Sequence, residues 1–102
     1  MQVHQLVEEI RAILGRPAGA PAWLCIEAAG IDDVDFSGGE TITDLLRELQ
    51  EQGTRLVFAD VDPDVREELD RYGVTSVIGT DAYFDTVEDA VEAFGANGRS
   101  AG

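Results

Sequence analysis

The fold of this chain is decided at the stretch Ile31-Asp32-Asp33-Val34-Asp35-Phe36-Ser37-Gly38-Gly39-Glu40. A short apolar run ends just before it, and apolar residues at helical spacing begin just after it. Ser37 with Glu40 three residues later matches a capping box, in which the two side chains satisfy each other's free backbone amides at the start of a helix. The sequence therefore predicts a strand-to-helix junction at which Ser37 caps the helix.

Helix and strand patterns alternate on both sides of this junction. Amphipathic helices are predicted for 3–14, for the segment from the Ser37 cap to the stop at Gly53, for 64–72 behind an Asp62 cap and Pro63, and for a last segment from an Asp85 or Thr86 cap to Phe94. Buried strands are predicted for 23–28 and 55–59 and a further strand for 82–84, whereas 77–78 is too short to assign. Such alternation is typical of βαβ units, so we expect an α/β fold with a small parallel or mixed sheet and four helices.

The length of 102 residues fits one domain, predicted to span 1–94, with a polar and disordered tail over 95–102. The net charge is −14, from 21 acidic and 7 basic residues, and no residue is a lysine. A field of this sign repels phosphate backbones and anionic headgroups, so no nucleic-acid partner is expected. With one cysteine, no secretory signal and no apolar run of about 20 residues, the chain is predicted to be cytoplasmic and not inserted in a membrane.

Signatures of catalysis are weak. Asp60 follows an apolar strand, as does the nucleophile of haloacid-dehalogenase phosphatases and receiver domains, but those families also use a lysine, and Asp62 is better explained as a helix cap. A calcium loop starting at Asp60 fails because Val65 replaces the turn glycine. Asp32, Asp33 and Asp35 are more simply solvent-facing or capping residues than metal ligands. We therefore expect no enzyme activity, cofactor or metal, with an aspartyl-phosphate hydrolase using Asp60 as a minor alternative.

Ser37 is the remaining candidate for a functional role. The flanking glycines leave little steric obstruction to a docking partner, and a phosphate on Ser37 would face the positive end of the helix dipole. It would also add roughly two negative charges beside Asp33 and Asp35. The predicted interaction and switch loop, with Ser37 as the phospho-acceptor, consists of Asp33, Asp35, Phe36, Ser37, Gly38 and Gly39.

In combination, these segments resemble a STAS domain. The resemblance rests on the strand followed by Asp35-Phe36-Ser37-Gly38-Gly39, on Gly53-Thr54-Arg55-Leu56-Val57-Phe58-Ala59, and on the later segments 65–73, 78–79 and 83–90. The chain is most similar to the C-terminal cytoplasmic STAS domain of SulP sulfate and anion permeases, from the first helix to Phe94. Ser37 falls where the related anti-sigma-factor antagonists carry a phosphorylated serine, but Phe36 replaces the polar residue usual before it, which favours the permease branch.

The resemblance implies a non-catalytic interaction and regulatory module of sulfate or anion transport. Its partner would be a transporter membrane domain or a regulatory protein, and the alternative is an anti-sigma-antagonist-like phosphoswitch acting through Ser37. The family fold opens with strands before the first helix, one of them inside the sheet, so we expect a STAS-like sheet that lacks these strands. An unfilled strand position invites another chain, which predicts self-association.

Overall fold

The computed structural model describes residues 2–17, 19 and 21–101, and for 97–101 the backbone alone. Its helices are α1 (Val3–Leu14), α2 (Phe36–Glu51), α3 (Pro63–Arg71), α4 (Val74–Ile78) and α5 (Val87–Ala101). Its strands are β1 (Trp23–Glu27), β2 (Arg55–Ala59) and β3 (Tyr83–Phe84), with single 3₁₀ turns at Ala28–Gly30 and Thr80–Ala82. The predicted α/β class is confirmed.

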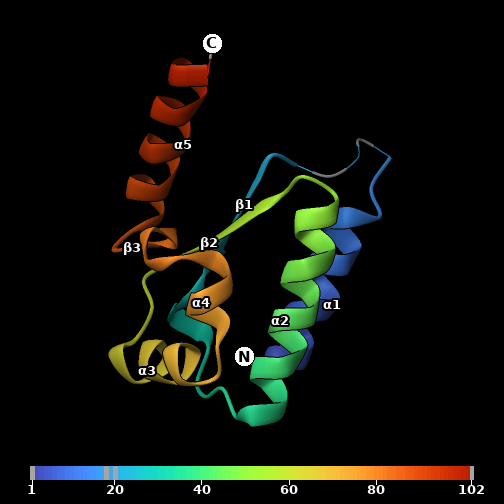
Figure 1. Cartoon of the computed structure of the whole chain (residues 1–102), viewed down its shortest axis with the longest axis vertical. Coiled ribbons are helices and arrows are strands. Elements are labelled where there is room, and N and C mark those ends of the chain that lie inside the picture. The colour runs from blue at the N-terminus through green and yellow to red at the C-terminus, as the bar shows by residue number, and fades with distance from the viewer. Residues whose placement is uncertain (1, 18, 20, 102) are drawn as a thin grey trace.

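The three strands form one parallel sheet in the order β1-β2-β3. The register places Cys25 beside Val57 and Phe58 beside Tyr83. In Figure 1, α1 and α2 lie side by side, and α5 extends away from the sheet at the other side of the molecule. Because successive strand residues point to opposite faces, the sheet contributes to two apolar clusters.

The larger cluster joins the sheet to α1, α2, α3 and α4. Ile26, Leu56 and Phe58 meet the apolar stripes of these helices in it, and Leu45, Leu49 and Leu69 are almost completely buried. The smaller cluster lies under α5, where Val57 and Ala90 pack with Trp23 and Cys25. The sheet is therefore covered by several helices on one face and by α5 on the other.

The two longer strands differ in burial. From Leu56 to Ala59 β2 is fully buried, as its sequence predicts for a strand covered on both faces. In β1, the side chains of Trp23, Leu24 and Cys25 are only half-buried. The prediction of full burial is wrong for β1 because this strand forms an edge of the sheet.

The expected number of helices needs correction. The described residues form five helices instead of four, since the segment around 77–78 belongs to α4, which follows Gly73 in the left-handed conformation (φ 86°). In this structure α5 extends to Ala101, and the disordered tail expected for 95–102 stays a prediction. The domain boundary at 94 stays a prediction.

The open strand position also lies elsewhere than expected. In this structure β1 and β2 pair directly along their whole length, so no vacancy separates them. Among the described residues the sheet ends at β1, whose outer edge has no partner strand. The expectation of an opening inside the sheet is thus replaced by an open edge at β1.

Candidate functional site

The predicted loop lies where the chain enters α2. Asp35, with φ −86° and ψ −179°, is the residue before the helix, and its Oδ1 accepts a hydrogen bond of 2.7 Å from the Gly38 amide. The Asp35 carbonyl accepts the first helical bond, from the Gly39 amide at 2.9 Å. The N-cap is therefore Asp35, and the capping box predicted for Ser37 and Glu40 is wrong.

Ser37 lies inside the first turn of α2 as its second residue. Its side chain is exposed, and its carbonyl accepts a hydrogen bond of 3.0 Å from the Thr41 hydroxyl. Within the described part of the chain, no interaction is found for the Ser37 hydroxyl itself. The side chain is thus accessible at the positive end of the helix dipole without a capping role.

Tyr72, at the end of α3, fixes the orientation of the loop. The Phe36 ring is 63% exposed and meets the Tyr72 ring edge-on, with 5.9 Å between the centroids. Gly39 is buried against the same tyrosine, and a Cβ there would lie 2.6 Å from the Tyr72 Cβ. The sequence suggests that both glycines leave room for a docking partner. In the structure this is wrong for Gly39, because it is buried and allows close packing against Tyr72.

A second contact with α3 involves two carboxyl groups. Glu68 accepts a hydrogen bond of 3.3 Å from the Val34 amide through Oε2. Its side chain also shares a hydrogen bond with Asp33, which together with partial desolvation and the negative charge of Asp33 raises the pKa of the Glu68 carboxyl. The Asp33 end of the loop is therefore held to α3 by a proton-dependent contact.

A groove runs between α1 and the start of α2. It has a volume of about 760 Å³ and is lined by Gln2, Val3, His4, Val7, Glu8, Arg11, Asp32, Asp33, Asp35, Ser37, Gly38 and Thr41. His4 Nε2 lies 3.3 Å from Glu8 Oε1. The Arg11 guanidinium donates two hydrogen bonds to the Glu48 carboxylate of α2, at 2.8 and 3.2 Å. Because Arg11 is engaged with Glu48, negative charge dominates the end of the groove near Ser37.

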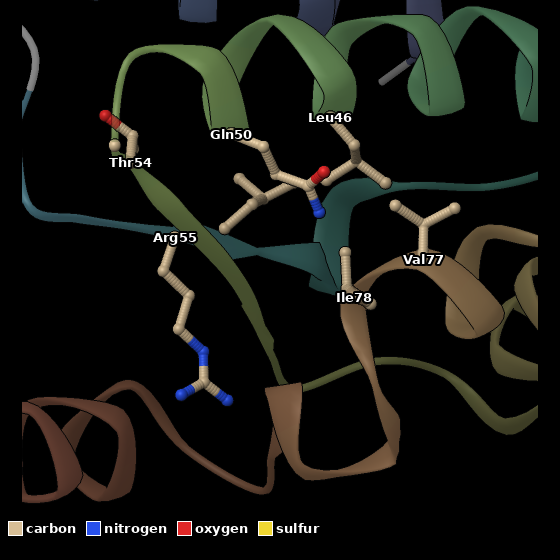
Figure 2. A pocket seen from close by; sticks show the side chains of 8 residues that line it. Leu46, Gln50, Thr54, Arg55, Val77 and Ile78 are labelled. Carbon is tan, nitrogen blue, oxygen red and sulfur yellow. The ribbon is translucent and has the colours of Figure 1, made fainter.

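A smaller hollow of about 260 Å³ lies between α2, the start of β2 and α4. Figure 2 shows the side chains of Leu46, Gln50, Val77 and Ile78 around it, while Arg55 extends away. The Arg55 guanidinium lies over the Trp23 ring at 4.8 Å and 3.3 Å from Asp81. The one charged side chain at this hollow is therefore already paired.

The aspartates after β2 serve the turn and the next helix. Asp60 has φ 57°, and its amide donates to the Phe84 carbonyl at 3.0 Å. Asp62 caps α3 by accepting a 2.9 Å hydrogen bond from the Asp64 amide, as predicted. Among the described residues, no group of three or more His, Cys, Asp or Glu side chains is arranged to hold a metal ion.

The contacts that surround the predicted loop come from parts of the chain that local sequence patterns do not connect with it. Tyr72, Glu68 and the lining from α1 are distant in sequence from the loop, and only the packing of α3 and α1 brings them there. The helical spacing of α1 and the small residues Gly38 and Gly39 are the only sequence signals of these contacts, and neither names the partner.

Taken together, the fold and the loop define a small parallel α/β domain that presents a capped strand-to-helix loop beside an acidic groove. None of the helices in the described part of the chain is long and apolar enough to span a bilayer.

The chain belongs to the STAS domain family, whose model matches residues 2–90. It is 36% identical over 72 residues to high affinity sulfate transporter 1 of Stylosanthes hamata, covering 71% of this chain and 11% of that protein. It is 32% identical over 93 residues to sulfate transporter 1.2 of Arabidopsis thaliana, covering 89% of this chain and 14% of that protein. The chain thus spans only about a tenth to a seventh of the length of these relatives.

A solved structure supports the fold. The STAS domain of a SulP transporter from Vibrio cholerae superposes with a TM-score of 0.80 at 15% sequence identity, covering 94% of this chain and 75% of that one. The predicted resemblance to the STAS domains of SulP transporters is therefore confirmed.

Proposed function

We propose that this chain is a non-catalytic interaction module that regulates sulfate or anion transport from the cytoplasmic side. The observation that carries the proposal is the family match, in which the relatives found are sulfate transporters. The working surface is the loop around Asp35, Phe36 and Ser37, which combines an exposed aromatic ring with acidic groups. Its partner is a transporter membrane domain or a regulatory protein.

The arrangement of the loop supports such a surface. Asp35 fixes the backbone by accepting a hydrogen bond from the Gly38 amide. The Phe36 ring packs edge-on against the Tyr72 ring. A rigid, exposed aromatic side chain loses little conformational entropy on binding, and such side chains often dominate the energy of an interface. The loop is therefore ordered before a partner arrives.

A chimera tests the proposal. The matched 93-residue segment of the Arabidopsis transporter would be replaced by this chain, and sulfate uptake would be measured in yeast cells that lack their own sulfate transporters. We expect uptake well above that of the transporter with the segment deleted. Uptake equal to that of the deletion, with the chimera present at the cell surface in equal amount, would contradict the proposal.

A phosphoswitch at Ser37 is the second candidate, favoured by the exposed hydroxyl in the first turn of α2. A phosphate there meets the helix dipole favourably but adds charge next to Asp33 and Asp35, so its effect on a partner would be large. The test is labelling by anti-sigma-factor serine kinases of the wild-type chain and of Ser37→Ala. Label that depends on Ser37 supports this candidate, and equal or absent label removes it.

A further inference from the structure

Phe36 is the most exposed of the large apolar side chains among the described residues. Its ring has a fixed position, because it meets the Tyr72 ring edge-on and Tyr72 packs tightly against Gly39 of α2. The exposed side of the Phe36 ring therefore offers an apolar face that is set in place before any partner binds. Covering this face with a partner is favourable because its apolar area is removed from water.

Acidic side chains accompany this ring along α2. Glu40 lies one helical turn after Phe36, and Asp44 lies a further turn along the same exposed face of the helix. Asp35 precedes the ring in the chain, and one of its carboxylate oxygens accepts the hydrogen bond from the Gly38 amide. Together, Asp35, Phe36, Glu40 and Asp44 form a surface that we call the α2 stripe.

Most of the negative charge of the α2 stripe is not neutralised by this chain. Among the described residues, the stripe makes one ion pair, between Asp44 and Arg47 at 3.6 Å, and no ion pair involves Asp35 or Glu40. Other arginines form ion pairs elsewhere, namely Arg11 with Glu48, Arg55 with Asp81, Arg66 with Asp70 and Arg71 with Glu67. A cationic group from another molecule could therefore reach Asp35 and Glu40 without first breaking an ion pair.

We propose that the α2 stripe binds a cytoplasmic loop of the transporter membrane domain that carries lysine or arginine, an inference that rests on the proposed regulatory function of the chain. Loops on the cytoplasmic side of membrane proteins carry an excess of these two residues. The partner is therefore a positively charged polypeptide segment, and the stripe offers it carboxylates beside an apolar anchor.

Arginine fits both parts of the stripe, since its guanidinium can stack on an aromatic ring and also pair with a carboxylate. The chain itself contains such an arrangement. The Arg66 guanidinium lies over the Tyr83 ring at 3.7 Å, and its Nε donates a hydrogen bond of 3.1 Å to Asp70. An arginine of the partner can make the same two contacts with Phe36 and Glu40.

Charge decides against other occupants of the α2 stripe. A second copy of this chain would bring the same carboxylates and a formal charge of −14, and a membrane surface would bring anionic headgroups. Both would be repelled, whereas a loop with lysine or arginine would be attracted. Because salt screens this attraction, binding should weaken as the ionic strength rises.

Peptide binding tests this proposal. Labelled synthetic peptides with the sequences of the cytoplasmic loops of Arabidopsis sulfate transporter 1.2 would be titrated with the complete chain, and binding would be followed by fluorescence anisotropy. We expect at least one peptide with several lysine or arginine residues to bind. Raising the salt concentration from about 50 to about 300 mM should weaken its binding severalfold.

Two variants of the stripe and one control locate the binding site. Phe36→Ala should weaken binding at least about fivefold, as expected for the anchor of an interface. The double variant Glu40→Gln with Asp44→Asn should weaken it by a similar factor, because it removes two carboxylates. Glu88→Gln with Glu92→Gln removes the same charge at the same spacing from α5, at the other side of the molecule (Figure 1), and should leave binding unchanged. Circular dichroism would show that all variants fold.

The proposal is overturned if no loop peptide with lysine or arginine binds, or if the α5 double variant weakens binding as much as the stripe variants do. This failure is distinguishable from a failure of the proposed function, which the transporter chimera tests separately. A chimera that takes up sulfate, together with peptides that ignore the stripe variants, would contradict only the assignment of the α2 stripe.

Discussion

The backbone of Gly39 packs directly against the side chain of Tyr72, so that a Cβ at position 39 would lie 2.6 Å from the Tyr72 Cβ. This contact joins the first turn of α2 to the end of α3. It sets how the proposed working loop is held, because the neighbouring Phe36 ring rests on the same tyrosine.

Gly39→Ala should lower the free energy of unfolding by about 2 kcal/mol, as expected for forcing a methyl group into a packed contact. Gly38→Ala is the matched control, because its Cβ would meet side-chain atoms of Asp35 and Val3 at 3.1 and 3.3 Å, and these can shift. Urea denaturation of both variants checks the difference. Equal destabilisation would show that the Tyr72 contact is not what requires glycine at position 39.

The capping role can be assigned by substitution. Asp35→Ala should cost about 1 kcal/mol because the Gly38 amide loses its partner, while Asp35→Asn should retain most of the stability. Ser37→Ala should be nearly neutral, since its side chain makes no cap. Thermal unfolding of the three variants distinguishes the assignments, and a larger loss for Ser37→Ala than for Asp35→Ala would restore Ser37 as the cap.

Glu68 should make stability depend on pH. Its pKa in the folded chain is raised above the ordinary value of 4.5, mainly by the hydrogen bond with Asp33, so the folded state holds the proton more tightly than the unfolded state. The protonated Glu68 therefore stabilises the folded state at a pH below its ordinary pKa. This contribution is lost as the pH rises through the raised pKa of the folded chain. Glu68→Gln removes this titrating group. The melting temperature of the variant, relative to that of the wild type, should therefore increase as the pH rises.

The control for this pH effect is Glu9→Gln on α1, which removes the same charge from an exposed helical position. Because the net charge is strongly negative, any such substitution reduces repulsion at neutral pH, and the control measures that general gain. If the melting temperatures of the two variants change in parallel with pH, the contact between Glu68 and Asp33 does not contribute.

Asp60 has the left-handed conformation that aspartate, asparagine and glycine adopt more readily than other residues. Asp60→Ala should therefore lower the free energy of unfolding by about 1 kcal/mol, whereas Asp60→Asn and Asp60→Gly should leave it unchanged or raise it. Urea denaturation of the three variants checks this.

Asp60→Asn also tests for activity, since we expect no magnesium-dependent phosphatase activity from the wild type. Activity in the wild type that Asp60→Asn abolishes would instead identify Asp60 as a nucleophile.

Local patterns were sufficient to predict most elements of the fold. The apolar spacing of α1 and the run of β2 give the residues of both elements, and the Asp62 cap with Pro63 predicts the start of α3. In each case neighbouring residues alone determine the conformation. By contrast, α4 is short and rich in β-branched residues, so its helical state depends on packing against α2 and α3.

The start of α2 could not be predicted in the same way. Asp35 and Ser37 are both good capping residues, and two short-range rules compete there. In the structure Asp35 is the cap, and Tyr72, which is distant in sequence, packs beside Gly39 in the first turn. Similarly, the half-burial of β1 follows from its place at the sheet edge, which no local pattern encodes.

The most direct measurement for the central claim is the initial rate of sulfate uptake by the transporter chimera with single substitutions in this chain. Phe36→Ala removes the exposed ring of the loop, and Val91→Ala, which removes an exposed apolar side chain on α5, is the matched control. With equal amounts at the cell surface, the account predicts that Phe36→Ala loses most of the uptake and Val91→Ala keeps it. Full uptake with Phe36→Ala would contradict the claim that this loop is the working surface.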